Sequence, residues 1–271
     1  MKLSLSEIST VNASFEEDVA AYAAAGFEGI GIWEMKLPAD DAANIALVRS
    51  AGLGVASCVP TVPSILPLRL PGMEGPQDPA ERVTALCSSM RRLAAFEPEC
   101  VLVLTGPAAG RASQGVVVEA LRRIAATADD AGVHLGLEPA HPAQHDSVSF
   151  VTSIAETLAL LDEAGLDGVG IMADPYNLWH EPPEALAAVA GRVTGLHVAD
   201  EPAEPERTDR VLPGEGGSRA GEHLAALRAA GWDGYLDVEI FSTPDRFWGL
   251  PVAEAARHAH LAAAALCQTE P

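Results

Sequence analysis

The sequence predicts an α/β protein of the (β/α)8 TIM-barrel class. Eight short segments rich in Val, Ile and Leu alternate with longer segments that carry a helical apolar pattern. Strands separated by helices in this way pair in parallel, and eight such units close into a barrel. Neither GxGxxG nor GxxxxGK[ST] follows the first strand, so nothing supports a doubly wound open sheet.

Length and charge fit one such barrel and limit its partners. With 271 residues, 48% of them hydrophobic, the chain is expected to form a single domain over residues 1–271. The formal net charge of −21 argues against a nucleic acid or an anionic membrane, because both bind to basic patches. We therefore expect a small, soluble substrate.

Two further features bear on location and redox chemistry. The N-terminus carries no extended apolar segment, and no apolar run reaches the roughly 20 residues that a bilayer requires, so a cytoplasmic location is expected. The four cysteines, Cys58, Cys87, Cys100 and Cys267, lack CxxC spacing and are expected to act as small buried apolar residues.

The first four strand–helix units are predicted from apolar alternation and helix caps. Strands are expected at 2–9, 29–33, 55–59 and 101–105, and helices at 15–25, 40–51, 79–96 and 113–131. Ser14 and Ser113 are the expected N-caps, and Pro79 suits a first helical position. The long, proline-rich segment 60–78 is expected to form a lid or binding loop.

The last four units follow the same rules. Strands are expected at 134–138, 169–173, 193–198 and 235–241, and helices at 153–164, 182–190, 219–230 and 251–266. Glycine follows several of these helices, for example at Gly165 and Gly231, as expected for a helix C-terminus.

Each of these four strands carries an ionisable side chain near its end. They are Glu138, Asp174, His197 and Glu239. The active site of a TIM barrel lies at the C-terminal ends of its strands, so we expect the four side chains to converge on one rim. The alternative is that they merely end strands and are solvated or paired with arginines.

Three converging carboxylates repel one another unless a cation or a proton neutralises them. Oxygen-rich ligands with one imidazole suit Mn²⁺, Mg²⁺ or Co²⁺ in near-octahedral coordination, and Zn²⁺ is less favoured without thiolates. Four protein ligands leave about two open positions, which a vicinal diol or a hydroxy-ketone can fill.

The motifs around these residues resemble a known family. GLEPAHP, ADPYNLWHEP, GLHVADEP followed by DRVLPGEG, and GYLDVEIFS with RFWGLP are similar to the xylose isomerase-like TIM-barrel superfamily, specifically its sugar phosphate isomerase/epimerase group. The resemblance covers most of the chain and is densest from 137 to 251.

This resemblance implies one divalent metal ion, with Mn²⁺ preferred, held by Glu138, Asp174, His197 and Glu239. It implies an isomerase or epimerase that abstracts a proton from a small keto-sugar, sugar phosphate or polyol, with Glu138 and Glu239 as the acid/base pair and the metal stabilising the enediolate. Members are often dimers or tetramers, so a homo-oligomer is possible.

Several substrate-binding residues are also suggested. Arg210 matches a family position that reaches substrate oxygens, and its alternative is a surface arginine paired with Asp209 or Glu206. His141 is a candidate donor to a substrate hydroxyl, or else caps a loop. Further candidates are Glu34 beside Trp33, which can instead be core, and Trp179 with Phe247 and Trp248, which can instead pack as a lid.

One position departs from the family pattern. Many members read Asp-x-x-His after the sixth strand, whereas this chain reads Asp174-Pro-Tyr-Asn177. Asparagine cannot take up a proton at neutral pH, so either Asn177 binds an unusual substrate or His180 partly substitutes.

The departure keeps other functions in view. One is a lyase similar to inosose or dehydroshikimate dehydratases, and another is a non-catalytic ligand-binding barrel. An apurinic endonuclease is disfavoured, because no histidine precedes His134 to supply ligands for a cluster of about three metals.

Overall fold

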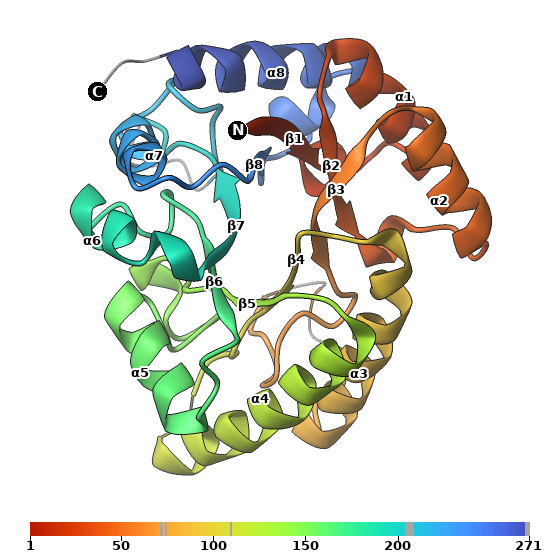
Figure 1. Ribbon diagram of the computed structural model, residues 1–271. Helices are drawn as coiled ribbons and strands as arrows, with labels where there is room; N and C mark the ends of the chain where they lie inside the picture. The colour runs from red at the N-terminus through yellow and green to blue at the C-terminus, as the bar shows by residue number, and fades with distance from the viewer. Residues whose placement is uncertain (71–72, 74, 109, 204–208, 269–271) are drawn as a thin grey trace.

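A parallel β-barrel forms the centre of the protein. The computed structural model describes residues 1–70, 73, 75–108, 110–203 and 209–268. Within them, eight strands pair in sequence order, and β8 pairs back to β1 to close the barrel (Figure 1). All eight pairings are parallel, which confirms the TIM-barrel prediction.

The strands and helices alternate along the whole chain. The strands are β1 Lys2–Ser6, β2 Gly29–Trp33, β3 Gly54–Val59, β4 Cys100–Val103, β5 Leu135–Leu137, β6 Gly170–Ala173, β7 Val193–Val198 and β8 Tyr235–Val238. The helices are α1 Phe15–Ala25, α2 Asp41–Ser50, α3 Pro79–Leu93, α4 Arg111–Ala131, α5 Ile154–Ala164, α6 Pro183–Ala188, α7 Ala220–Ala229 and α8 Val252–Gln268.

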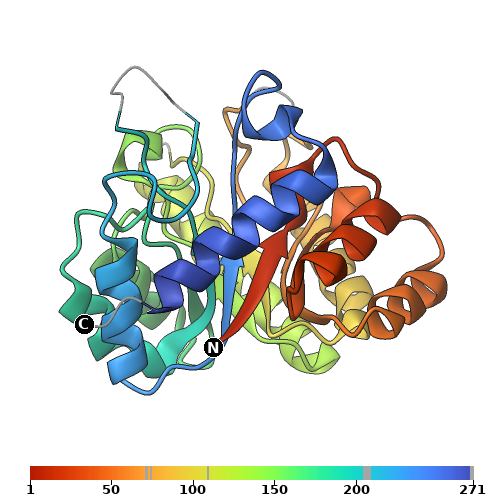
Figure 2. The ribbon, with the colours of Figure 1, turned by 90° about the horizontal axis from the view of Figure 1, so that it is seen from above.

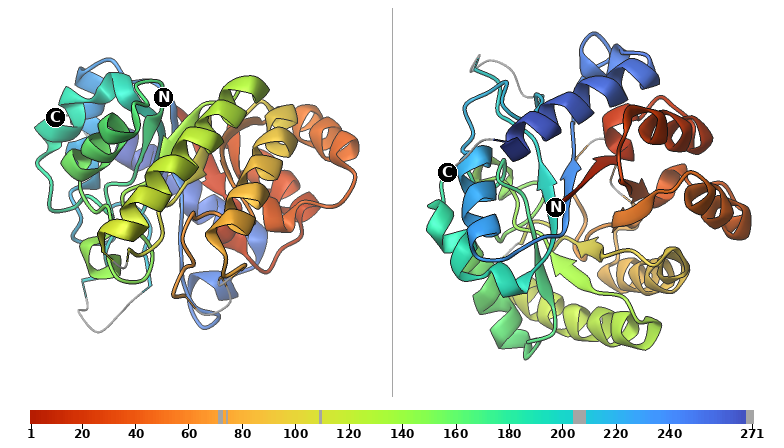
Figure 3. Two further views of the ribbon diagram at one scale, coloured as in Figure 1. Left: turned by 90° about the horizontal axis from the view of Figure 1, so that it is seen from below. Right: turned by 45° about the horizontal axis from the view of Figure 1, so that its top comes forward.

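The helices form an outer layer around the strands. Neighbours such as α3 and α4 pack against each other in this layer (Figure 3). The side view separates the two ends of the barrel, with the N-terminus at one end and the 3-10 helix Phe247–Gly249 of the β8–α8 loop at the other (Figure 2). The loops that follow the strands therefore gather at the end away from the N-terminus.

The first and the last strand differ most from their expected bounds. The first strand ends at Ser6, because the chain turns into a 3-10 helix over Glu7–Thr10, and the last ends at Val238 instead of 241. The pairing of these two strands therefore ends where the loops at this end of the barrel begin.

Most expected helix starts are present. Ser14 forms a capping box with Glu17 at the start of α1, and Ser153 accepts a hydrogen bond from the backbone N–H of Glu156. The prediction for Ser113 is wrong, since α4 begins at Arg111. Gly110, with φ 89°, turns the chain into the helix earlier and leaves Ser113 in the first turn.

The long segment after β3 is fixed to the barrel over the part that precedes residue 71. The N–H of Leu104 donates to the carbonyl of Pro63 (2.8 Å), and the N–H of Ile65 donates back to Leu104 (3.0 Å). Gly106 lies so close that a Cβ there would be 2.3 Å from the carbonyl oxygen of Leu66. This segment is thus an added wall that extends the β3–β4 side of the barrel.

Two other expectations concern burial and membranes. Cys58, Cys87 and Cys100 are free and buried as expected, while Cys267 is half-buried. In the described ranges, none of the helices combines the length and the apolar character needed to cross a bilayer.

Candidate metal centre

Three buried side chains meet at the C-terminal end of the barrel. Glu138 follows β5, His197 lies in β7 and Glu239 follows β8. One ligand atom from each lies within 4.8 Å of the other two. His197 Nδ1 is 3.6 Å from Glu138 Oε1 and 3.4 Å from Glu239 Oε2. The convergence expected from the strand ends is present for these three residues.

The backbone fixes both glutamates. The N–H of Glu138 donates to the carbonyl of Val103 on β4 (3.1 Å), and the N–H of Glu239 donates to Val198 on β7 (3.0 Å). Each glutamate thus continues the hydrogen bonding of its strand by one residue, and its side chain starts from a rigid position.

The far side of the His197 ring faces the barrel interior. Its Nε2 lies 3.3 Å from Ser57 Oγ and 3.8 Å from Asp237 Oδ2, and Ser57 donates to Asp237 (2.8 Å). Gly31 makes room for this carboxylate, because a Cβ there would be 2.2 Å from Asp237 Oδ2. Ser57 and Asp237 therefore orient the ring, as outer partners do for histidine ligands in metal sites.

The sequence also contains a signal for Asp237. Residues i and i+2 of a strand face the same side. Asp237 and Glu239 are so spaced in the run YLDVEIF, and the buried Asp237 points into the barrel below the cluster.

The near nitrogen of the ring has no hydrogen-bond partner among the described residues. His197 Nδ1 is fully buried and faces the two glutamates. Burial lowers the pKa of His197, but Glu239, Glu138 and Asp237 raise it, and the result is a pKa of about 10. Without a metal ion, a protonated ring balances the carboxylates. An unpartnered imidazole nitrogen between two carboxylates also fits a divalent cation, which would take the place of that proton.

Asp174 reaches this cluster through Arg210. Asp174 directly follows β6 and is fully buried. Arg210 Nη1 lies 2.9 Å from Asp174 Oδ2 and 3.1 Å from Glu239 Oε2. Asp174 is outside the three-residue group, but the same guanidinium joins it to Glu239, so Asp174 stands beside the group.

Arg210 is buried, which removes the alternative of a surface arginine. Its side chain lies over the rings of Tyr176 (4.4 Å from Cζ to the ring centre) and Phe241 (5.0 Å). The backbone N–H of Arg210 donates to the carbonyl of Phe241 (2.7 Å). Glu206, one of the two partners expected for a surface arginine, lies outside the described residues.

Asp200 organises the loop that carries Arg210. Its carboxylate accepts hydrogen bonds from the N–H groups of Gly214, Gly216 and Ser218, at 3.1, 3.1 and 2.6 Å. Its backbone pairs with Val211. These contacts hold the motif DRVLPGEG against the end of β7, and Arg210 in this motif lies beside the cluster.

The surroundings of Glu239 bring the pKa of its carboxyl group close to neutral. Burial raises its pKa, His197 and Arg210 lower it, and Glu138 and Asp174 raise it again, which leaves a pKa of about 7. A carboxyl group with such a pKa can both accept and return a proton under ordinary conditions.

Asn177 contacts Glu138 from the side. Its Nδ2 donates to Glu138 Oε1 at 3.4 Å, while its buried Oδ1 has no partner in the described part of the chain. The amide therefore holds one of the two glutamates, and Asn177 is one of the residues that line the cavity.

Other candidate residues lie outside the cavity. His141 accepts from the N–H of Ala143 and caps a short 3-10 helix, which was its alternative role, and its ring stacks on Trp179. His180 contacts the edge of Trp179. The structure groups these three rings, but none of them lines the cavity as described.

Glu34 is also held away from the cavity. Its carboxylate accepts from the N–H of Thr61 (2.9 Å) and from Ser89 Oγ (2.6 Å), and it lies 3.5 Å from Arg92. It ties β2 to α3 and the segment after β3. The neighbouring Trp33 does line the cavity, as does Trp248.

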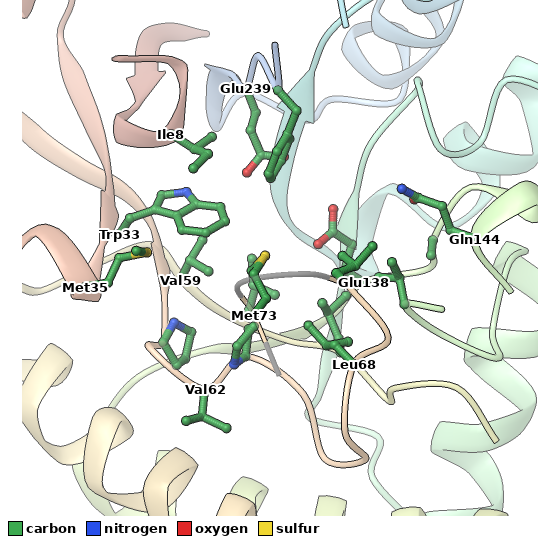
Figure 4. Close-up of a pocket in the computed structure, with 18 of the residues that line it drawn as sticks. Ile8, Trp33, Met35, Val59, Val62, Leu68, Met73, Glu138, Gln144 and Glu239 are labelled. Carbon is green, nitrogen blue, oxygen red and sulfur yellow. The ribbon is translucent and has the colours of Figure 1, made fainter. Parts of the chain in front are cut away.

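A cavity of about 660 Å³ adjoins the cluster. Glu138, Asn177, Arg210 and Glu239 line one side of it. Figure 4 shows Glu138 and Glu239 facing a space that is bounded on the other side by Trp33 and Val59. The cavity falls in the range of small-molecule sites, and the two glutamates are accessible to whatever binds there.

Comparisons with known proteins agree with the barrel. A family model described as "Xylose isomerase-like TIM barrel" matches residues 19–264. Among solved structures, protein SMc04130 from Sinorhizobium meliloti 1021 is 23% identical, with a TM-score of 0.85 and 99% of each chain covered. The IOLI protein with a bound zinc atom is 20% identical, with a TM-score of 0.80 and 98% of each chain covered. D-psicose 3-epimerase in the presence of D-fructose is 18% identical, with a TM-score of 0.75 and 97% of each chain covered. No curated protein matches the chain.

Proposed function

Because the chain belongs to the xylose isomerase-like TIM-barrel family, we propose that it is a divalent-metal-dependent isomerase or epimerase of a small hydroxy-carbonyl compound. The observation that carries the proposal is the buried group of Glu138, His197 and Glu239, in which His197 Nδ1 has no hydrogen-bond partner among the described residues. The solved IOLI structure with zinc and the D-psicose 3-epimerase structure support it by analogy.

The proposed ligands are Glu138, His197 and Glu239, with Asp174 as the fourth. When bound, the ion polarises a substrate oxygen and offsets the charge that develops there. Mn²⁺ fits this donor set best, and Mg²⁺, Co²⁺ and Zn²⁺ remain candidates. Asp237 and Ser57 act only by holding the His197 ring.

The two glutamates are the proposed acid/base pair. They come from β5 and β8, and both line the cavity. One carboxylate takes the proton from the carbon next to the carbonyl, and the electron pair of the broken C–H bond is delocalised onto the carbonyl oxygen. Return of a proton to the same carbon on the other face gives an epimer. Return to the former carbonyl carbon gives an isomer, because the hydroxyl proton of the first carbon moves to the former carbonyl oxygen and the first carbon becomes the new carbonyl.

Arg210 and Asn177 contribute charge and position. The guanidinium of Arg210 lies beside Glu239 and can donate to a substrate oxygen that gains negative charge. Asn177 fixes Glu138 through its Nδ2, and its free Oδ1 can accept from a substrate hydroxyl. Neither residue needs to transfer a proton in this scheme.

Asn177 is also the observation that favours a second candidate, a lyase. The family position that is often histidine here lacks a titratable group, so the chemistry at the neighbouring substrate oxygen can differ. A dehydratase would use the same carboxylates to remove the proton and would then expel a hydroxyl group as water.

The test is a proton-exchange assay on the protein with defined metal content. The metal-free protein, prepared with a chelator, and the Mn²⁺-loaded protein are incubated with a panel of ketoses in D₂O and followed by NMR. We expect metal-dependent deuterium uptake at the carbon next to the carbonyl. Uptake without water loss supports an isomerase or epimerase, and water loss supports the lyase. A protein that binds no divalent metal and is unaffected by chelators would refute both.

A further inference from the structure

The cavity beside the two glutamates is largely apolar. We propose that the natural substrate is a hydroxy-ketone, or a related enolisable carbonyl compound, that carries a large hydrocarbon substituent, and that it is neither a free sugar nor a sugar phosphate. The hydroxy-carbonyl end of this substrate rests on the proposed function, and the hydrocarbon substituent rests on the lining of the cavity. It concerns the wall that faces Glu138 and Glu239.

The first half of the barrel supplies one part of this wall. Trp33 from β2, Val59 from β3 and Leu102 from β4 are all buried and line the cavity, together with Ile8. Figure 4 shows Ile8, Trp33 and Val59 across the open space from Glu138. Any group that reaches across from the glutamates therefore meets hydrocarbon.

The segment after β3 supplies the rest. Val62, Leu68, Leu70 and Met73 from this segment all line the cavity. The wall is held in place, because the N–H of Arg69 donates to Ser147 (2.9 Å) and Pro63 and Ile65 pair with the chain after β4. A wall of this composition is a binding surface for an apolar group. Binding is favoured because the apolar group and the wall remove each other's surface from water.

The two indole N–H groups of the wall already have partners. Trp33 Nε1 donates to Ser6 Oγ (3.0 Å), and Trp248 Nε1 donates to the carbonyl of Ile240 (3.0 Å). Thr61, Gln144 and Tyr176 are the other uncharged polar residues in the described lining apart from Asn177. The hydroxyl groups of a sugar chain would lose water against the hydrocarbon wall without enough new partners, so the cavity disfavours a polyol.

The two arginines that line the cavity, Arg82 and Arg210, also have partners within the protein. Arg210 pairs with Asp174 and Glu239. Arg82 donates to the carbonyl oxygen of Ser64 (2.8 Å) and to its hydroxyl (2.6 Å), and it also donates to Pro76. Arg210 and Arg82 are the arginines and lysines of the described lining, and Arg210 lies at the acidic end. A phosphate group at the far end of a substrate would therefore meet the hydrocarbon wall, where Arg82 already donates to Ser64 and Pro76.

The experiment compares ligands of increasing chain length. The Mn²⁺-loaded protein is titrated calorimetrically with hydroxyacetone, 1-hydroxy-2-octanone, D-fructose and D-fructose 6-phosphate. Each buried CH₂ group strengthens binding by about fourfold at most, so we expect 1-hydroxy-2-octanone to bind on the order of 100-fold more tightly than hydroxyacetone. We expect both sugars to bind more weakly than 1-hydroxy-2-octanone.

Variants of the wall make the test specific. Leu70→Asn places an amide of similar size in the wall, and Leu261→Asn makes the same change on the outer surface of α8, where the leucine is 58% exposed. Leu70→Asn should weaken 1-hydroxy-2-octanone about tenfold and leave hydroxyacetone unchanged, while Leu261→Asn should change neither. Val62→Thr, a change of nearly the same shape, should act in the same direction as Leu70→Asn.

Three results would overturn the inference. They are equal affinity for the two hydroxy-ketones, tighter binding of either sugar, and equal behaviour of the Leu70→Asn and Leu261→Asn variants. Deuterium uptake by the bound ligands separates this inference from the proposed function. If 1-hydroxy-2-octanone binds with the expected preference but no uptake occurs, the substrate class stands and the proposed reaction fails. If D-fructose exchanges its proton as well as the octanone does, the reaction stands and the inference fails.

Discussion

The two halves of the barrel present opposite chemistry to the same cavity. The β5–β8 half lines it with Glu138 and Glu239, which His197 and Asp174 contact from behind or through Arg210, and the loop after β7 adds Arg210 itself. The β1–β4 half and the segment after β3 supply an almost continuous hydrocarbon wall. The proposed reacting groups therefore lie on one half and most of the apolar wall lies on the other, while Phe241 and Trp248 of the β8 side complete the wall. A substitution in the wall of the first half should leave the proposed reacting groups intact.

Below the cavity, residues of the β1–β4 half also support the polar groups of the other half. Ser57 from β3 and Gly31 from β2 belong to the first half, yet they position Asp237 and, through it, the ring of His197. The first half thus contributes to the proposed metal centre from inside the barrel, and only its cavity-facing surface is devoted to recognition.

The largest effect should come from removing a proton acceptor on the polar half. Glu239→Gln keeps the shape of the side chain but cannot accept a proton, so we expect metal-dependent deuterium uptake to fall on the order of 10³-fold. Thermal unfolding should show that the variant is still folded. The control is Glu16→Gln on α1, where the glutamate is exposed. Full activity of Glu239→Gln would contradict the role proposed for it.

The next effect tests the support from below the cavity. Asp237→Asn removes the charge that faces His197 Nε2, and we expect Mn²⁺ affinity to fall about 10- to 100-fold, as measured by calorimetry. Asp233→Asn, the same change at an exposed position four residues earlier, should leave the affinity unchanged. If both variants bind Mn²⁺ like the parent, Asp237 does not support the centre.

The polar half should also respond to pH, and the sign follows from His197. Its folded pKa of about 10 lies above the ordinary value of 6.5, so its stabilising contribution is full below pH 6.5 and is lost as pH rises through 10. The metal-free protein should lose stability over this range. Mn²⁺ displaces the same proton, so its apparent affinity should rise up to about tenfold per pH unit there. Chemical unfolding and metal titrations at several pH values check both trends.

The smallest effect on turnover should occur where the polar half meets the substrate. Asn177→Ala removes a hydrogen bond to Glu138 and the free Oδ1, but no proton donor, so we expect mainly a change in substrate preference. Relative kcat/KM values over a panel of hydroxy-ketones measure this change. A loss as deep as that of Glu239→Gln would mean that Asn177 takes part in the proton transfer itself.

Much of the fold was predictable because its signals are local. The strands at 29–33 and 193–198 have the predicted bounds, since apolar runs between glycines and polar turns define them. Ser113 was misassigned because the turn is set by the backbone conformation of Gly110, which a pattern of side chains does not contain.

The site was predictable only in part. Strand ends located Glu138, His197 and Glu239, because all barrel strands deliver their final residues to one end. The environment of Glu34 was not predictable, since Ser89 and Arg92, far along the chain on α3, decide where its carboxylate points. The apolar wall was missed for the same reason, because its course depends on hydrogen bonds to the chain after β4.

The position of Arg210 has a consequence for how the protein is handled. Its guanidinium bridges Asp174 and Glu239, and the rings of Tyr176 and Phe241 hold it there. The two acids are therefore restrained by a permanent internal counter-charge, so stripping the metal should not scatter them. The empty barrel should survive dialysis and accept a fresh ion reversibly, which would make side-by-side reconstitution with different metals practical from a single preparation.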